Sequence, residues 1–223
     1  MVNKKDIHIS ASARISAGVI LDASEGAIII DEDALIDIGA LIKGPTYIGK
    51  NSTINLGAKL NGEVCIGPYC KIGGEVEHTT FHGYSNKQHD GFLGHSYIGE
   101  WVNLGANTNN SDLKNNYGLI QLIKDDQKIE TGMQFLGTMM GDYSRTGIST
   151  MLNTGTIIGL GANIFGAGFQ DKYIPSFRWG KNDTTELEKL FNTVENMKQR
   201  RGKSLSSDEK IFLTELFEKQ IIK

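Results

Sequence analysis

The sequence predicts an all-β protein, a parallel β-helix of six-residue repeats with a C-terminal α-helical appendage. Large apolar residues recur at an unbroken six-residue interval, a period that fits neither an α-helix nor an alternating strand. The residue two positions before each of the last seven is mostly small. The large residues are Ile30, Ile36, Ile42, Ile48, Ile54, Leu60, Ile66 and Ile72, and the small set is Ala34, Ala40, Thr46, Ser52, Ala58, Val64 and Cys70. One large and one small inward side chain per segment indicates short flat strands joined by tight corners.

The same interval recurs on both sides of this block. It is held by Ile9, Ile15 and Leu21 upstream, and by Phe92, Ile98, Leu104, Met140, Thr146, Leu152, Ile158 and Ile164 downstream. About nineteen units at three per turn predict roughly six turns. Many glycines directly follow an inward aliphatic residue, where we expect corners with a positive φ. Asn51, Asn103 and Asn107 are expected to adopt similar corner conformations.

Composition narrows the classes of function. The chain has 223 residues, 39% of them hydrophobic, and a net charge of −3, which disfavours nucleic acid or an acidic membrane surface as a partner. No apolar run has the length of a membrane span, and residues 1–10 lack a signal-peptide pattern, so we expect a cytoplasmic protein. Cys70 falls in a small inward slot and is expected to be a core thiol, while nothing suggests that Cys65 forms a disulfide.

Two domains are expected, a β-helix over residues 1–170 and a connector with two helices over residues 171–223. The first helix is predicted from apolar residues at helical spacing between Leu187 and Met197, ending at Gly202. Ser206 and Glu209 form a capping-box pattern at the start of the second helix. Such a helical tail is expected to cover the end or flank of the coil.

The repeat is interrupted twice, over residues 74–91 and 107–136, and loops inserted in a repeat coil tend to gather on a binding face. Four of the five histidines lie in or beside the first interruption, and the second is rich in asparagine. The histidines are His78, His82, His89 and His95. A neutral histidine beside amides and carboxylates is suited to act as a general base.

The run His89–Asn107 (HDGFLGHSYIGEWVNLGAN) resembles the acetyltransferase domain of bifunctional GlmU-type sugar-1-phosphate nucleotidylyltransferase/acetyltransferases. The resemblance extends roughly from Ile30 to Ile174 and covers only the C-terminal half of those enzymes. It implies a left-handed β-helix and a homotrimer with acyl-CoA sites between subunits. It also implies transfer of an acetyl group from acetyl-CoA to an amino-sugar phosphate or a nucleotide sugar. A separate nucleotidyltransferase subunit is a further partner that the resemblance suggests.

The resemblance also implies roles for individual residues. His89 falls on the catalytic base, Glu75 on a carboxylate that positions the amine, and Asn103 on a sugar-contacting asparagine. Asp112 replaces the family's catalytic asparagine, unless Asn110 or Asn109 takes that role. Lys114 matches a basic residue of the family. Glu77 stands where the family has a phosphate-binding lysine, and Lys87 is expected to offer a replacement charge. Phe92 stands in place of the tyrosine of the motif.

Some residues outside the motif are also candidates. Lys172 and Arg178 are placed to hold a phosphate of coenzyme A, although Phe177 and Trp179 beside them are equally suited to docking the helical tail. His95 is expected to be a corner residue, and no metal is predicted. Two alternative functions stay open. One is a non-catalytic trimeric sugar-binding or assembly module, and the other is a zinc enzyme similar to γ-class carbonic anhydrases, which bind zinc through three histidines.

Overall fold

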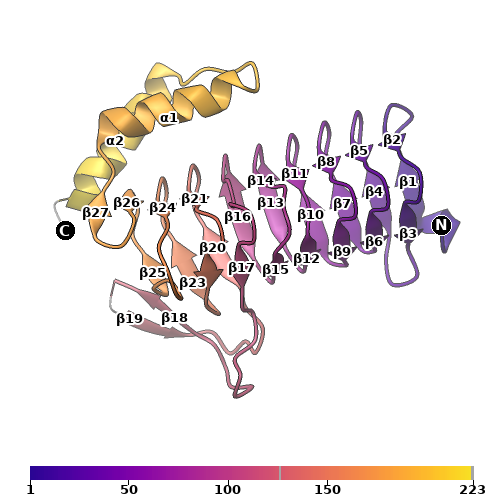
Figure 1. Ribbon diagram of the computed structural model, residues 1–223, viewed down its shortest axis with the longest axis horizontal. Coiled ribbons are helices and arrows are strands. Elements are labelled where there is room, and N and C mark those ends of the chain that lie inside the picture. Colours follow the sequence, from indigo (N-terminus) through magenta and orange to yellow (C-terminus); the bar gives the residue numbers. More distant parts are fainter. Residues whose placement is uncertain (126, 222–223) are drawn as a thin grey trace.

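The computed structural model describes residues 1–125 and 127–221, and its main part is a left-handed parallel β-helix with three faces (Figure 1). The first face consists of β1 (Ile7–Ile9), β4 (Ile28–Ile30), β7 (Thr46–Ile48), β10 (Val64–Ile66), β13 (Thr80–Gly83), β16 (Tyr97–Glu100), β20 (Thr138–Met140), β23 (Thr156–Ile158) and β25 (Tyr173–Ile174). The second consists of β2 (Arg14–Ile15), β5 (Leu35–Ile36), β8 (Thr53–Ile54), β11 (Lys71–Ile72) and β14 (Asn86–Lys87), and then β21 (Arg145–Thr146), β24 (Asn163–Ile164) and β26 (Arg178–Trp179). The third consists of β3 (Ile20–Asp22), β6 (Leu41–Lys43), β9 (Lys59–Asn61), β12 (Glu75–Glu77) and β15 (Phe92–Gly94), followed by β17 (Asn109–Asn110) and β22 (Met151–Leu152). A 3-10 turn, η1 (Lys4–Asp6), precedes β1.

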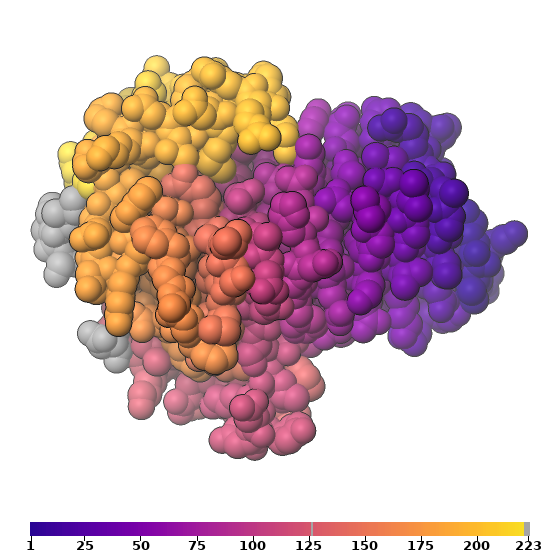
Figure 2. All heavy atoms as spheres, in the orientation of Figure 1, coloured from indigo at the N-terminus to yellow at the C-terminus, as the bar shows by residue number. Residues whose placement is uncertain are grey.

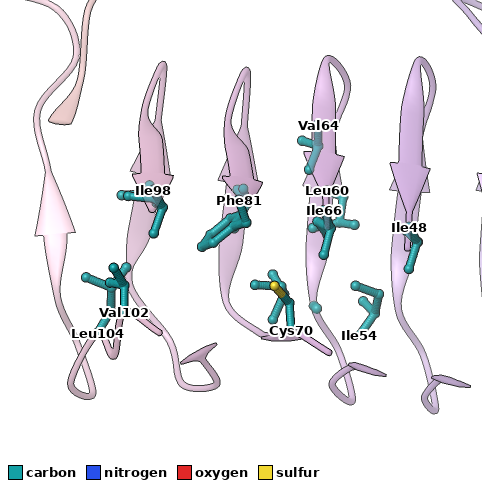
Figure 3. Packing of buried hydrophobic residues seen from close by; sticks show 14 of the residues in the cluster. Ile48, Ile54, Leu60, Val64, Ile66, Cys70, Phe81, Ile98, Val102 and Leu104 are labelled. Atoms are coloured by element: carbon teal, nitrogen blue, oxygen red, sulfur yellow. The ribbon is translucent and has the colours of Figure 1, made fainter. Parts of the chain in front are cut away.

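The interior of the central block, from Ile30 to Ile72, is the predicted one. All eight large and all seven small residues of the central repeat are buried, and no exposed fraction among them exceeds 4%. Figure 3 shows members of this set, with Ile48 and Ile66 on neighbouring coils of the first face. Cys70 belongs to this core, and burial raises the pKa of its thiol to about 12. The six-residue spacing therefore identified which side chains of the central block point inward. It was wrong at Phe92, which pairs with the outward Glu75 and is half-buried, while the next residue, Leu93, points inward.

The number of turns was underestimated, because nine strands stack on the first face rather than about six. A regular coil consists of three repeats, as the pairing of Tyr47 with Cys65 shows. The next two coils are shorter, since Cys65 pairs with Thr80 and Thr80 with Tyr97. Residues 74–91 thus break the six-residue spacing without leaving the coil. Parallel pairing also continues beyond residue 170, where Tyr173 pairs with Ile157.

The glycines after inward aliphatic residues serve a different purpose from the one predicted. Gly67 and Gly73 lack a positive φ, but a Cβ at Gly67 would lie 1.8 Å from the His82 oxygen of the next coil. The close approach of neighbouring backbones therefore excludes a side chain. The positive φ values fall elsewhere at the corners, as at Asn51 (58°) and Asn107 (57°), whereas Asn103 pairs on the second face and has no positive φ.

The corner between the first and second faces carries a column of aromatic residues, here called the aromatic corner. Tyr69, Tyr84, Trp101, Tyr143 and Phe177 all have a positive φ there. The first three stack, with ring centroids 5.0 Å apart for Tyr69–Tyr84 and 4.3 Å for Tyr84–Trp101. Aromatic rings fill these positions because each can pack on the ring one coil away.

Two helices cover the C-terminal part of the aromatic corner (Figure 1). They are α1 (Leu187–Gln199) and α2 (Ser207–Ile221), and a short strand, β27 (Asp183–Thr184), pairs antiparallel with β26 before them. The predicted capping box is present, because Ser206 N donates to a Glu209 carboxylate oxygen at 2.9 Å and Glu209 N donates to Ser206 Oγ at 3.2 Å. Lys198 of α1 is buried, pairs with Glu209 and lies over the Trp101 ring.

The second interruption does form a loop. It leaves the coil after β17, projects on the side opposite the helices (Figures 1 and 2), and contains the hairpin β18 (Gln121–Lys124) and β19 (Gln127–Glu130). It returns at β20, so that Tyr97 pairs with Met139 on the far side of the insertion. In the part of the chain that the structure describes, no helix combines the length and apolar character needed to span a membrane.

A charge placed at an inward position is expected to unfold the coil. Ile54 is fully buried, whereas Leu56, two residues on, is 73% exposed. Ile54→Asp buries a carboxylate without a partner, so we expect a loss of more than about 4 kcal/mol in the free energy of unfolding. Leu56→Asp is the control and is expected to change it by less than about 0.5 kcal/mol. Chemical denaturation measures both. A soluble Ile54→Asp protein with the melting temperature of the wild type would contradict the assigned inward phase.

Candidate functional site

A histidine–aspartate pair lies where the long loop leaves the coil. His95 follows β15 at the corner between the third and first faces, with φ 46°, and Asp112 follows β17 one coil later. Nδ1 of His95 lies 2.8 Å from Oδ2 of Asp112, and the two side chains are 22% and 14% exposed. The carboxylate lies against Gly94, where a Cβ would come within 2.3 Å of its oxygen. This corner is called the His95 corner below.

Stacked rings hold the imidazole of His95 in place. His78 occupies the same corner one coil earlier, with φ 45°, and its ring stacks on that of His95 at 4.4 Å between centroids. Phe135, from the returning end of the loop, stacks on the His95 ring at 5.1 Å. The ring is thus oriented by Asp112 and restrained by two neighbouring rings.

The pair has the geometry of an oriented base. An ionised carboxylate only accepts hydrogen bonds, so Nδ1 of His95 carries the proton that it donates to Asp112. Nε2 of the neutral ring then keeps its lone pair and is available to remove a proton or to ligate a metal.

The His95 corner also holds the residues most suited to a cation. Ligating atoms of Glu77, His78 and His95 all lie within 4.8 Å of one another. Glu77 accepts a hydrogen bond from Asn61 Nδ2 at 2.9 Å. The two other histidines of the first interruption lie elsewhere. His82 contacts the Tyr97 hydroxyl on the first face, and His89 lies at another corner. Within the described part of this chain, three histidines therefore do not come together as the alternative zinc site requires.

The predicted catalytic set is divided between two corners. His89 is exposed at the corner between the second and third faces, one face of the coil away from His95. A groove of about 300 Å³ beside it is lined by Glu75, Asp90 and Asn107, among others. Glu75 forms an exposed ion pair with Lys59 at 3.7 Å. Glu75 thus shares the groove with Asp90, the residue after His89, whereas Asp112 is paired with His95.

Two predicted substrate-binding residues have structural contacts inside the coil. Asn110 is buried, where it accepts a hydrogen bond from Gly94 N at 2.8 Å and donates one to Gly94 O at 2.9 Å. Lys87 is 2% exposed and pairs in register with Ile72. Its ammonium donates to the carbonyl oxygens of Gly73 at 2.9 Å and His89 at 3.1 Å. Lys87 therefore does not present its charge to a ligand at the surface.

The other predicted binding residues lie in three places. The pKa of Lys172 is lowered, mainly by burial and to a smaller extent by the positive charge of Lys114. The two ammonium groups are therefore close enough to repel each other. Lys114 lines a cleft of about 410 Å³ that begins at Ser111, directly before Asp112. Arg178 lines a different pocket near the C-terminal end of the coil. Asn103 bridges β14 and β21 on the second face, away from both corners.

Sequence reasoning named Asp112 as a candidate but did not predict its partner. His95 was predicted to be a corner residue, which it is, but its pairing with Asp112 was not predicted. The sequence signal for this pairing is the spacing of the three residues. His78, His95 and Asp112 follow one another at equal steps in the sequence. Each step has the length of one coil, the separation of the strand partners Thr80 and Tyr97. Residues one coil apart at the same corner lie in contact, so this spacing places the three side chains together.

Comparisons with known proteins agree with the resemblance to GlmU-type enzymes. No family profile matches the chain. The bifunctional sugar-1-phosphate nucleotidylyltransferase/acetyltransferase of Sulfurisphaera tokodaii is 34% identical over 143 residues, which cover 63% of this chain and 36% of that protein. The bifunctional protein GlmU of Synechococcus elongatus is 31% identical over 130 residues, covering 57% and 25%. The chain thus matches about a third of the length of these relatives or less.

Solved structures are similar to this chain at a lower level. A Bacillus cereus protein described as a proposed acetyltransferase has a TM-score of 0.43 and 14% identity over 93% of this chain and 92% of its own. A variant of AntD, an N-acyltransferase from the same species, in complex with dTDP and coenzyme A, has a TM-score of 0.41 and 16% identity over 83% and 90%.

The buried ammonium of Lys87 is expected to make stability depend on pH. Burial lowers the pKa of Lys87 from 10.5 to about 8, while Asp90 and Glu75 partly offset the shift. Between pH 8 and 10.5 the unfolded chain binds more protons than the folded one, so the free energy of unfolding rises with pH, by about 3 kcal/mol in total. Below pH 8 both states are protonated and the contribution is constant.

Lys87→Met isolates this effect, because it keeps the length of the side chain and removes the charge. Denaturant unfolding at pH 7.5 and 10 should show the rise in the wild type and in a Lys50→Met control at an exposed position. The rise should be absent in Lys87→Met. If the free energy of unfolding changed equally with pH in all three proteins, the pKa of Lys87 would not be lowered by burial, and the prediction would be wrong.

Proposed function

We propose that this chain is an acyl-CoA-dependent N-acetyltransferase that acts on an amino-sugar phosphate or a nucleotide sugar. The observation that carries the proposal is the hydrogen bond between His95 and Asp112 at the corner where the long loop leaves the coil. The similarity to GlmU-type proteins supports the class of reaction. A homotrimer, a cytoplasmic location and a partner nucleotidyltransferase stay predictions.

The chemistry requires a base, because a protonated amine has no lone pair for attack. In the proposed step the amine nitrogen attacks the thioester carbonyl carbon, and Nε2 of His95 takes the proton that the nitrogen loses. The new C–N bond forms and the C–S bond breaks. The proton then passes from His95 to the departing thiolate of coenzyme A. Asp112 holds the ring in the required tautomer and stabilises the imidazolium.

The cleft next to Asp112 is suited to the cosubstrate. Lys114 lines the cleft, and Lys172 reaches its wall by a hydrogen bond from Nζ to Thr154 Oγ1 at 3.4 Å. Asn115, Asn116 and Asn153 supply amide donors. Cations of this kind bind phosphate groups, and amide donors can stabilise a developing oxyanion. We therefore assign phosphates of acetyl-CoA to the two lysines. Arg178 lies apart from them and is not part of this assignment.

Thiol release from acetyl-CoA in the presence of an amino-sugar panel tests the proposal. His95→Gln and Asp112→Asn should each lower kcat by about 100-fold or more, the usual contribution of a general base. The matched control is His8→Gln, an exposed histidine on β1 at the far end of the coil, which should retain wild-type activity.

His89→Gln separates this proposal from the assignment that the resemblance implies. We expect near wild-type kcat for His89→Gln if His95 is the base. Loss of activity on changing His89, with His95→Gln still active, would overturn the role of His95. Absence of turnover in the wild type with every amine would contradict the enzymatic function and favour a non-catalytic sugar-binding module.

A further inference from the structure

A second pocket lies between the end of α1 and the second face of the coil, away from the His95 corner. Its volume is about 250 Å³. Two of its cations, Lys71 and Arg145, come from β11 and β21, and two more, Arg200 and Arg201, directly follow α1. The pocket therefore exists only because the helical tail folds back over the coil.

The charge of this pocket is unbalanced. Among the described residues no carboxylate lines it, and none of the four cations forms an ion pair. The chain as a whole has a net charge of −3. Four cations gathered without a counter-charge in a protein of acidic balance indicate a site for an anion.

Arg145 provides a second, independent observation. Its Nε is buried and has no hydrogen-bond partner among the described residues. Burial also lowers the pKa of this guanidinium. A buried donor without an acceptor is costly, and a guanidinium is shaped to donate to two oxygens of a phosphate at once. Arg145, which lines the pocket, thus carries a guanidinium whose Nε lacks an acceptor within the described part of the protein.

The neighbouring side chains limit what the ligand can be. Arg201 is positioned by a hydrogen bond from its Nη2 to Asn86 Oδ1 at 3.2 Å. The Tyr84 ring lies between Tyr69 and Trp101, so a nucleobase has no free face of that ring on which to stack. Ligand pockets for whole small molecules usually measure roughly 300 to 1,000 Å³. A pocket of about 250 Å³ suits a compact anionic group.

We infer that this pocket binds the phosphate or diphosphate group of a small ligand, through Arg145, Arg201 and Lys71. The site is separate from the proposed acyl-transfer site and does not depend on it. Because two of its cations belong to the tail, a bound anion would also tie the tail to the coil.

Calorimetric titration with inorganic pyrophosphate at constant ionic strength tests the inference without any turnover. We expect one pyrophosphate per chain in the wild type. Arg145→Gln and Arg201→Gln should each weaken binding by about tenfold or more, as loss of a charge-assisted hydrogen bond requires. Arg14→Gln, an exposed arginine on the same face at the N-terminal end, is the matched control and should bind as the wild type does.

Further ligands distinguish the source of the phosphate. Equal binding of pyrophosphate and uridine diphosphate would indicate a diphosphate, and preference for coenzyme A over its dephospho form would indicate a phosphate monoester. Arg201→Gln changes a residue outside the coil, so it keeps the test valid if Arg145→Gln does not fold. No binding at millimolar pyrophosphate, or equal affinity in the wild type and the folded variants, would overturn the inference.

Discussion

The narrow interior of the coil is the constraint on which the rest of the structure depends. Each face contributes a few inward side chains, and successive coils lie one strand spacing apart, about 4.8 Å. A large residue and a small one alternate along the chain, as Ala34 and Ile36 do, because two large residues on every strand would not fit. Once the inward set is buried, every corner is fixed in register with the corner of the next coil.

Corners in register become columns of side chains. At the aromatic corner the column runs from Tyr69 to Phe177, and its C-terminal part, from Tyr84 onward, forms the surface on which the helices pack. At the His95 corner the column is His78 and His95, continued by Asp112. The same geometry thus produces a docking surface at one corner and an oriented imidazole at another. The difference lies only in the residue type at the corner and in the loop that leaves after Asp112.

The sequence was sufficient for the interior and insufficient for the corners. Ile54 and Cys70 could be placed inside because the repeat specifies them independently of the neighbouring coils. The number of turns could not be obtained, since the two shortened coils after β10 lose the six-residue spacing while keeping strand pairing. Lys87 occupies an inward position in one of these shortened coils. A charged residue is not expected inside the coil, so a search for hydrophobic residues does not find this position. The pairing of His95 with Asp112 depends on a contact between coils, which the six-residue pattern does not reveal and which only the equal steps from His78 to His95 to Asp112 indicate.

The tautomer of the His95 imidazole tests the central claim most directly. Nitrogen-15 NMR of the histidine side chains at pH 8 distinguishes a proton on Nδ1 from one on Nε2, and His95→Gln assigns the signal. The hydrogen bond to Asp112 requires the Nδ1–H form, and Asp112→Asn should abolish the preference for it. A His95 signal typical of an unrestrained imidazole, unchanged by Asp112→Asn, would show that the two side chains do not form the proposed base.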